Sequence, residues 1–349
     1  MVGGSRAAAL AVLLQGAAGI RVASRQDPAG STSPCNGVGG SWVRIADPVK
    51  NPPVYYNATA LREAAGDAQR DFTPTAEEPY LPATLWDWVP FDSNCSFVKM
   101  QRATFCSAME RYGLRRLFVV GDSISYMMVQ SLWKLVDGEG DVGSQVSWDM
   151  WKGKTISVDK QIACPAGDVQ LRFVRNDRLT KTTYFQDCGD YCFPWWDEYV
   201  QSKQPTLLLV NTGLHRHVFK EFQGDVSTFL SQMVNTTEQR PGDKVVYRLG
   251  LPGHESCWDH KEPFKSKDEF KLGFLAEVYA WKFAPDQNKY VKNVARNKRQ
   301  TTKLNVRILD VYDMTIQRPD GHRGSDCLHY YLPGVVDWWN HLLVTELLA

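Results

Sequence analysis

The chain carries the run LFVVGDSIS at residues 117–125. Residues 117–120 are uninterruptedly apolar, which is typical of a short strand buried on both faces. Residues 124–136 continue with helical spacing, so the tripeptide GDS at residues 121–123 marks a sharp turn between strand and helix. A serine at such a turn presents its hydroxyl at a helix N-terminus, where backbone N–H groups can stabilise an oxyanion. The same tripeptide is also an ordinary helix-capping turn, so a role for Ser123 in catalysis needs a second signal.

Strand and helix patterns alternate along the rest of the chain. Further strands are expected at residues 169–174, 206–210, 244–249 and 306–309, and helices near residues 226–234, 270–283 and 335–348. This alternation predicts an α/β fold with a mainly parallel sheet covered by helices on both faces. In sheets of this kind ligands bind beyond the carboxyl ends of the strands, so candidate site residues are sought just after each strand.

Composition excludes several classes of protein. The 349 residues include 40 Lys and Arg against 39 Asp and Glu, which gives a net charge of +1. A dedicated nucleic-acid binder normally has a basic surplus, so no nucleic-acid partner is expected. The chain is 43% hydrophobic and 12% aromatic, which excludes a disordered scaffold and allows one large domain or two modest ones.

The N-terminus reads as a targeting segment. Arg6 precedes a short apolar run at residues 7–20, and small residues follow at 22–24, so residues 1–23 are expected to be a signal peptide. An uncleaved signal anchor or a disordered tail is the alternative, and an anchor would be the one attachment to a membrane. Residues 24–84 are expected to be a Gly/Pro/Ser-rich stalk and lead-in, and residues 85–349 the catalytic domain.

Cysteine usage agrees with the secretory pathway. The even number of cysteines, without paired CxxC spacing, favours disulfides over a zinc site, although eight cysteines allow 105 pairings. Sequons for N-glycosylation begin at Asn57, Asn94 and Asn235. The eight cysteines are Cys35, Cys95, Cys106, Cys164, Cys188, Cys192, Cys257 and Cys327.

A second signal lies near the C-terminus, where the run DCLH occupies residues 326–329. An Asp three residues before a His can hold its Nδ1, which leaves Nε2 free to accept a proton from a serine brought near by the fold. An isolated pair of this kind is also typical of a turn-capping Asp beside a surface His.

In combination these segments resemble the trichome birefringence-like (PC-esterase) proteins, which are plant-type polysaccharide O-acetyltransferases with an SGNH/GDSL-esterase-like core. The run FVVGDSIS at 118–125 is similar to their GDS block. The run DCLH at 326–329, with LPGVVDWWN at 332–340, is similar to their DxxH block and its tail. The blocks RxDGH, NTGxH, FRTxSPxH and WxWxPxxC are matched by RPDGH at 318–322, NTGLH at 211–215, RLGLPGH at 248–254 and WDWVP at 86–90 with Cys95.

The resemblance implies an SGNH-hydrolase-like three-layer sandwich with a smaller, disulfide-containing additional lobe, located in the Golgi lumen or outside the cell. It also implies a catalytic triad in which Ser123 is the nucleophile, His329 the general base and then acid, and Asp326 the group that orients His329. An acetyl group would move to Ser123 and then to a sugar hydroxyl. No bound cofactor is expected, but an acetyl donor is required as co-substrate, with a carbohydrate as acceptor.

Further residues of these blocks are expected around the triad. The backbone N–H of Ser123 and the side chain of Asn211 are candidate oxyanion donors, although an Asn after a strand is commonly a turn residue. Asp122 is expected to brace the turn rather than react. The other residues expected to line the site are Gly121, Gly213, His215 and His254, of which His254 could instead be structural. Arg318, Asp320 and His322 are expected to support the motif.

Two further features have plain explanations. His215 and His217 could share a metal, but no HExxH or Cys/His spacing accompanies them, so no metal site is expected. Arg175 and Arg248 lie near strand ends and could serve acidic sugars, but solvated surface arginines are the expectation.

The sequence also departs from the family pattern. The second cysteine of the family's HWC run is Tyr331 here, so its disulfide is absent or Cys327 pairs elsewhere. Only residues 323–325 separate the RxDGH and DxxH blocks. Two alternatives to the transferase stay open: an SGNH-type carbohydrate acetylesterase that uses water as acceptor, and a carbohydrate-binding protein with an inactive site.

Overall fold

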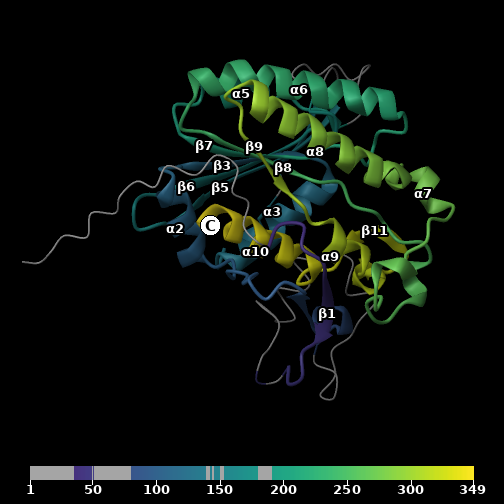
Figure 1. Ribbon diagram of the computed structural model, residues 1–349. Coiled ribbons are helices and arrows are strands. Elements are labelled where there is room, and N and C mark those ends of the chain that lie inside the picture. The colour runs from purple at the N-terminus through teal and green to yellow at the C-terminus, as the bar shows by residue number, and fades with distance from the viewer. Residues whose placement is uncertain are drawn as a thin grey trace, which may run out of the picture. The chain divides into compact units, whose positions relative to one another are not determined.

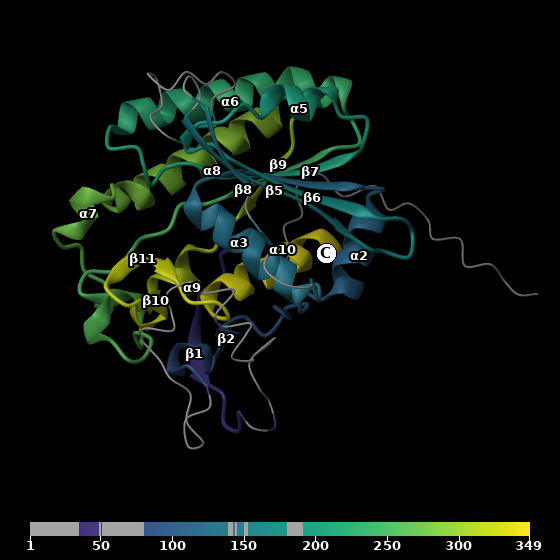
Figure 2. The same cartoon turned by 180° about the vertical axis from the view of Figure 1, so that it is seen from behind.

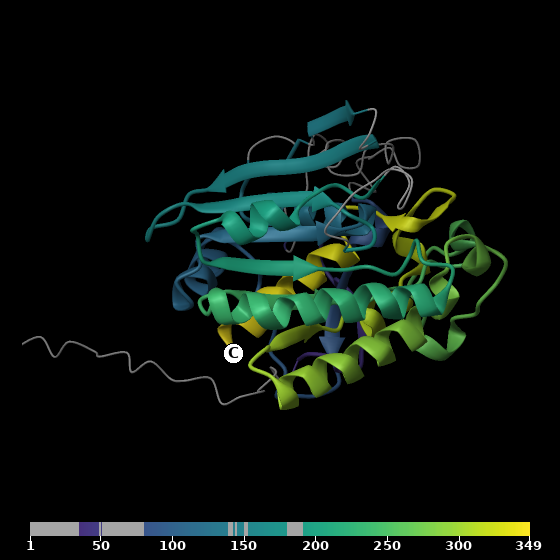
Figure 3. The ribbon, with the colours of Figure 1, turned by 90° about the horizontal axis from the view of Figure 1, so that it is seen from above.

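The sheet at the centre of the computed structural model has seven strands in the order β4-β5-β6-β3-β7-β8-β9. The five strands from β6 to β9 run parallel, and β5 and β4 extend one edge in antiparallel pairing (Figure 3). The predicted α/β class and mainly parallel sheet are confirmed. In sheet order the strands are β4 (Gln145–Asp149), β5 (Gly153–Ile162), β6 (Val169–Arg175), β3 (Arg116–Gly121), β7 (Thr206–Val210), β8 (Lys244–Arg248) and β9 (Val306–Leu309).

Helices cover both faces of this sheet, which gives the predicted three layers (Figures 1 and 2). One face carries α5 (Trp196–Gln201), α6 (Phe219–Gln239) and α8 (Ala284–Thr301), and the other α2 (Arg102–Arg111), α3 (Ser123–Leu135) and α10 (Val335–Leu348).

Strand β3 shows why the sequence requires two helical layers. Leu117 and Val119 pack in the core on the α3 and α10 side, whereas Phe118 and Val120 pack in the core on the α6 and α8 side. All four side chains are at most 2% exposed. Alternate residues of a strand point to opposite faces, so an uninterrupted apolar run is stable only where both faces are covered.

A smaller lobe lies beside the sheet and contains short elements from both ends of the chain. Trp42 of β1 is buried there; its Nε1 donates to the carbonyl oxygen of Met314, 2.8 Å away, and its ring contacts that of Trp338. The Cys35–Cys95 disulfide joins the segment before β1 to the segment after β2. The elements are β1 (Gly40–Arg44), η2 (Pro82–Thr84), β2 (Trp86–Pro90), α9 (Tyr312–Ile316), η7 (Pro319–Gly321), β10 (His322–Arg323) and β11 (Asp326–Tyr330).

The structure describes residues 35–48, 50, 80–138, 142–143, 145–149, 153–179 and 191–349, all of them in the unit Thr32–Ala349. The predicted signal segment and most of the predicted stalk lie outside the described residues. Residues 35–48 differ from a stalk, because β1 within them pairs with β2 and buries Trp42. Among the described residues, no helix is long and apolar enough to cross a membrane.

The prediction of one helix at residues 270–283 was wrong. That stretch holds α7 (Leu275–Val278) and η6 (Trp281–Phe283), and the long helix α8 begins only at Ala284. Pro285 occupies the first turn of α8, where a missing N–H costs nothing, and Ala280 has a left-handed backbone that interrupts a continuous helix. The short elements η4 (Cys257–Asp259) and η5 (Lys267–Glu269) precede this stretch.

The replacement Phe118→Ala should test the second helical layer. Phe118 is fully buried and its ring contacts those of Trp195 and Tyr199. Removing it leaves a cavity, so the free energy of unfolding should fall by about 3–5 kcal/mol in urea titrations. Phe91, which is 76% exposed, is the matched control, and Phe91→Ala should change stability by less than about 0.5 kcal/mol. Equal losses in both variants would contradict the two-layer packing.

Candidate active site

The turn between β3 and α3 places Ser123 at the carboxyl edge of the sheet. Asp122 is the N-cap of α3, and its Oδ1 accepts hydrogen bonds from the backbone N–H groups of Ile124 at 3.1 Å and Ser125 at 3.0 Å. Ser123 is therefore the first residue of the helix, with the positive end of the helix dipole behind it.

Gly121 lets this turn pack closely. A Cβ at position 121 would lie 2.3 Å from Ser125 Oγ and 3.2 Å from the carbonyl oxygen of Asn211. Neither neighbour can move easily, since Ser125 lies within α3 and Asn211 directly follows β7. The chain therefore needs glycine at this position.

The hairpin β10–β11 brings His329 and Asp326 to Ser123. Nε2 of His329 lies 2.8 Å from Ser123 Oγ, and Nδ1 of His329 lies 2.7 Å from Asp326 Oδ2. The other oxygen of Asp326, Oδ1, accepts hydrogen bonds from the backbone N–H groups of Leu328 and His329, each at 3.2 Å. The structure thus brings the three predicted triad residues into one continuous relay.

The relay fixes the proton positions. Burial opposes the charge on the Asp326 carboxylate, but its hydrogen bonds and its attraction to His329 outweigh that cost and hold the pKa of Asp326 well below its usual range. Asp326 is then an acceptor only, so Nδ1 of His329 carries a proton and Nε2 can accept one from Ser123. The side chains are partly open to solvent: His329 is 24% exposed and Asp326 44%.

A buried arginine lies behind the turn, which corrects the expectation that Arg248 is a solvated surface residue. Arg248 is 1% exposed; its Nη2 donates to Ser125 Oγ at 3.2 Å and lies 3.7 Å from Asp122 Oδ1. Burial lowers the pKa of Arg248, while the charge of Asp122 acts in the opposite direction. Arg248 is the last residue of β8, so the guanidinium reaches groups that follow another strand, β3.

Arg175 is also buried rather than solvated. Its Nε donates to Asp177 Oδ1 at 3.0 Å, and its guanidinium lies 3.6 Å from the centre of the Tyr191 ring. Burial raises the pKa of Asp177, whereas His215 and Arg175 act against that rise. His215, which was expected to line the site, lies beside this pair, with its Nε2 3.5 Å from Asp177 Oδ2.

Asn211 and Gly213 lie just after β7, which is the neighbour of β3. The side-chain amide of Asn211 donates to the carbonyl oxygen of Arg248 at 2.8 Å, and Asn211 is 2% exposed. One of its two amide protons is used in this bond, which joins the ends of β7 and β8. Gly213 has a φ of 144°, and a Cβ there would lie 2.6 Å from Gln287 Oε1.

The remaining predicted residues lie in or next to the β10–β11 hairpin. His254 is 1% exposed, with Nδ1 2.6 Å from His322 Nε2 and Nε2 2.8 Å from the carbonyl oxygen of Ile316. Arg318 donates to both carboxylate oxygens of Asp320, at 2.8 and 2.9 Å, in a buried pair.

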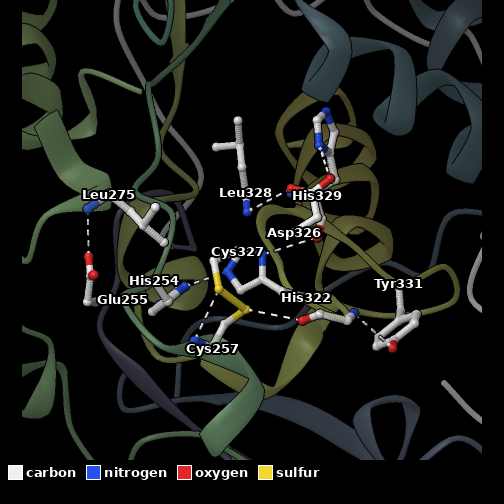
Figure 4. Close-up of a disulfide and its surroundings, with 11 residues drawn as sticks. His254, Glu255, Cys257, Leu275, His322, Asp326, Cys327, Leu328, His329 and Tyr331 are labelled. Carbon is white, nitrogen blue, oxygen red and sulfur yellow. Dashed lines mark hydrogen bonds and ion pairs between the residues drawn. A yellow bond between two sulfur atoms is a disulfide. The ribbon is translucent and has the colours of Figure 1, made fainter. Parts of the chain in front are cut away.

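A disulfide between Cys257 and Cys327 ties this hairpin to the loop after β8 (Figure 4). Of the two alternatives left open, the structure shows the second: Cys327 pairs with Cys257, while Tyr331 stands where the family pattern has a cysteine. Tyr331 accepts a hydrogen bond from the backbone N–H of Gly324 at 3.3 Å. A third disulfide joins Cys106 and Cys164, and Cys192 is also disulfide-bonded.

Residues that follow the DxxH block join α10 to α3, the helix that begins with Ser123. Ser131 of α3 donates to Asp337 Oδ1 at 2.6 Å and accepts from the amide of Asn340 at 2.9 Å. The helix that begins with Ser123 and the helix that follows the hairpin are therefore bonded to each other. Within the described part of the chain, no group of three or more His, Cys, Asp or Glu side chains could hold a metal ion.

Comparison with known proteins agrees with this arrangement. Residues 195–346 match the PC-Esterase family, described as a "GDSL/SGNH-like Acyl-Esterase family found in Pmr5 and Cas1p". The chain is 24% identical to Protein trichome birefringence-like 20 of Arabidopsis thaliana, over 90% of this chain and 72% of that protein.

Two shorter matches are to proteins of Populus trichocarpa. Xyloglucan O-acetyltransferase 1 is 28% identical over 27% of this chain and 26% of its own length. Xyloglucan O-acetyltransferase 3 is 35% identical over 30% of this chain and 29% of its own length. Together with the family match, these similarities confirm the predicted resemblance to the trichome birefringence-like and PC-esterase proteins.

The buried histidines should make the fold sensitive to acid. Burial lowers the pKa of His254 to about 3. The unfolded chain regains an ordinary histidine pKa of about 6.5, so it binds a proton that the folded chain does not between pH 6.5 and 3. The free energy of unfolding should therefore fall as pH decreases through this window, by about 1.4 kcal/mol per pH unit for this one group.

Urea unfolding of His254→Gln between pH 7 and 4 isolates that contribution. The variant should show a shallower dependence of stability on pH than the native chain, by about one bound proton. Equal slopes would mean that His254 is protonated in the folded protein.

Proposed function

We propose, taking the likeness to the trichome birefringence-like and PC-esterase proteins as premise, that this protein is a carbohydrate O-acetyltransferase with a Ser-His-Asp triad. The observation that carries the proposal is the relay from Ser123 Oγ through His329 to Asp326, at 2.8 and 2.7 Å, at the carboxyl edge of a parallel sheet. Relatives named xyloglucan O-acetyltransferase support a polysaccharide as the acceptor.

In the first half-reaction Ser123 Oγ attacks the acetyl carbonyl of the donor while His329 Nε2 takes the hydroxyl proton. The tetrahedral intermediate carries a negative oxygen, which the N-terminus of α3 and the backbone N–H of Ser123 stabilise. The C–O or C–S bond to the leaving group then breaks, and His329 returns the proton to that group. The product is an acetyl ester on Ser123.

In the second half-reaction a sugar hydroxyl takes the place of the leaving group. His329 accepts the proton of this hydroxyl as its oxygen attacks the acetyl-serine. The bond between the acetyl carbon and Ser123 Oγ then breaks, and His329 returns the proton to Ser123 Oγ. Asp326 stays ionised throughout and stabilises the imidazolium form of His329, because its pKa is held low. The chain's own residues, an acetyl donor and a sugar acceptor supply every group used in the two steps, so we propose no bound cofactor.

A location in the secretory pathway accompanies this activity. The disulfides Cys35–Cys95, Cys106–Cys164 and Cys257–Cys327 are consistent with an oxidising compartment. We place the protein in the Golgi lumen or outside the cell, with membrane attachment only through an N-terminal signal anchor.

An acetylesterase is the second candidate. The partial exposure of His329 and Asp326 lets water approach the relay, and water could replace the sugar in the second half-reaction. Both activities require the same triad, so they differ in the product rather than in the residues that form it.

The substitutions Ser123→Ala and His329→Ala should each lower kcat for acetyl transfer by at least about 10³-fold, because the nucleophile and its base act as one unit. Asn211→Ala should leave measurable activity, because its amide already donates to the Arg248 carbonyl oxygen and has one proton left for the oxyanion, and one such donor contributes roughly 10²–10³-fold. The assay supplies an activated acetyl ester and a panel of plant-type oligosaccharides, and measures acetylated sugar and free acetate together.

Acetylated sugar that depends on Ser123 would support the transferase, and free acetate with bare sugars would support the esterase. Near-normal turnover by well-folded Ser123→Ala would overturn the nucleophile assignment. Absence of both products from a folded protein that still binds glycan would favour the third interpretation, a carbohydrate-binding protein with an inactive site.

A further inference from the structure

The segment between β8 and α8, residues 255–282, presents exposed aromatic side chains. It lies beside the catalytic hairpin, by which we mean β10–β11 with Asp326 and His329. Phe274 is 75% exposed, Trp258 49% and Tyr279 37%, and Leu272 and Val278 add further apolar surface. A surface of this kind on a soluble domain usually marks an interaction site.

Buried anchors hold this segment in place. Ala276, Ala280 and Trp281 are each 1% exposed. The backbone N–H of Leu275 donates to Glu255 Oε2 at 2.9 Å. The exposed rings are therefore presented by a fixed backbone, which lowers the entropy lost when a ligand stacks on them.

The segment is also joined directly to the catalytic hairpin. Tyr279 stacks on Trp281 with ring centres 5.5 Å apart and an interplanar angle of 19°. A Cβ on Gly253 would lie 2.1 Å from the Trp281 ring and 2.5 Å from the carbonyl oxygen of Cys327, so these groups pack tightly. Cys327 follows Asp326 of the triad. Figure 4 shows the disulfide from Cys327 to the segment in the same close-up as the triad's Asp and His.

Trp258 borders a cavity where the segment meets residues 81–83 and the β10–β11 hairpin. Its volume is about 340 Å³, and its lining combines the Trp258 ring with His260, Lys261 and Tyr331. An aromatic wall with a few hydrogen-bonding groups suits a sugar ring, which has an apolar C–H face and hydroxyls at its edge.

Charge indicates which kind of glycan fits. Residues 255–282 contain five lysines and six carboxylate side chains, so the segment is close to neutral. A polyanionic glycan would be favoured by a basic surplus, which this segment lacks.

We propose that segment 255–282 is the acceptor-binding surface, and that it takes an uncharged polysaccharide by stacking sugar faces on Trp258 and Phe274. The choice of occupant rests on the proposed function. The disulfide Cys257–Cys327 holds this surface in a fixed position relative to His329. A hydroxyl of the bound polysaccharide can then reach the acetyl-serine.

Binding to full-length Ser123→Ala protein tests the inference without requiring catalysis. The probes are xyloglucan oligosaccharides and, as the acidic comparison, oligogalacturonides, measured by isothermal titration calorimetry. Adding Trp258→Ala and Phe274→Ala together should weaken xyloglucan binding by at least about tenfold, because two stacking contacts are lost. In the active enzyme the same pair should raise KM for this acceptor.

Phe91→Ala is the matched control, because Phe91 is 76% exposed on the β1–β2 lobe. Its affinity for xyloglucan should equal that of the parent protein. Unfolding curves of all variants verify that the fold is intact.

Xyloglucan affinity of the double variant within about twofold of the control would overturn the inference. Binding of oligogalacturonides as tight as that of xyloglucan would overturn the uncharged class of acceptor. If the parent binds xyloglucan through Trp258 and Phe274 but the active enzyme transfers no acetyl group, the proposed function fails while the binding surface stands.

Discussion

The contact between Ser123 Oγ and His329 Nε2 joins residues 206 positions apart, and the rest of the site depends on it. The serine side is fixed by the cap of Asp122 on α3 and by Arg248 behind it. The histidine side is fixed by the Cys257–Cys327 disulfide and by His322, whose ring bonds both the carbonyl oxygen of His329 and the ring of His254. A small shift of either side would break the relay, which explains why so many buried polar groups surround it.

Burying those polar groups costs free energy. The places where the fold keeps them therefore indicate where a fixed geometry is needed. Arg248 with Asp122, and Arg318 with Asp320, are charged pairs at most 1% exposed in their side chains. Taking such charges out of water offsets much of their attraction, and apolar residues would often stabilise a fold equally well. Both pairs lie next to elements that carry the triad. Their benefit is therefore the geometry that they impose on the β3–α3 turn and on the β10–β11 hairpin.

The sequence predicted the parts of the fold that depend on local pattern. The apolar runs gave the five parallel strands, and the GDS and DxxH segments gave the three residues of the relay. The prediction of a helix at residues 270–283 was wrong because an apolar pattern does not reveal the turns around Ala280 and Pro285. Burial of Arg248 could not be inferred, since its neighbours Asp122 and Ser125 come from another strand end. Strand β1 was missed because its pairing with β2 crosses a long connection.

The proposed function depends above all on the passage of the acetyl group through Ser123. The most direct measurement is peptide mass spectrometry of the protein after rapid mixing with an activated acetyl ester and acid quenching. We expect one acetyl group on the peptide that contains Ser123, its disappearance when a sugar acceptor is added, and no acetyl group in Ser123→Ala. An acetylated sugar formed without acetyl-Ser123, or with the acetyl group on another residue, would contradict the proposed passage through Ser123.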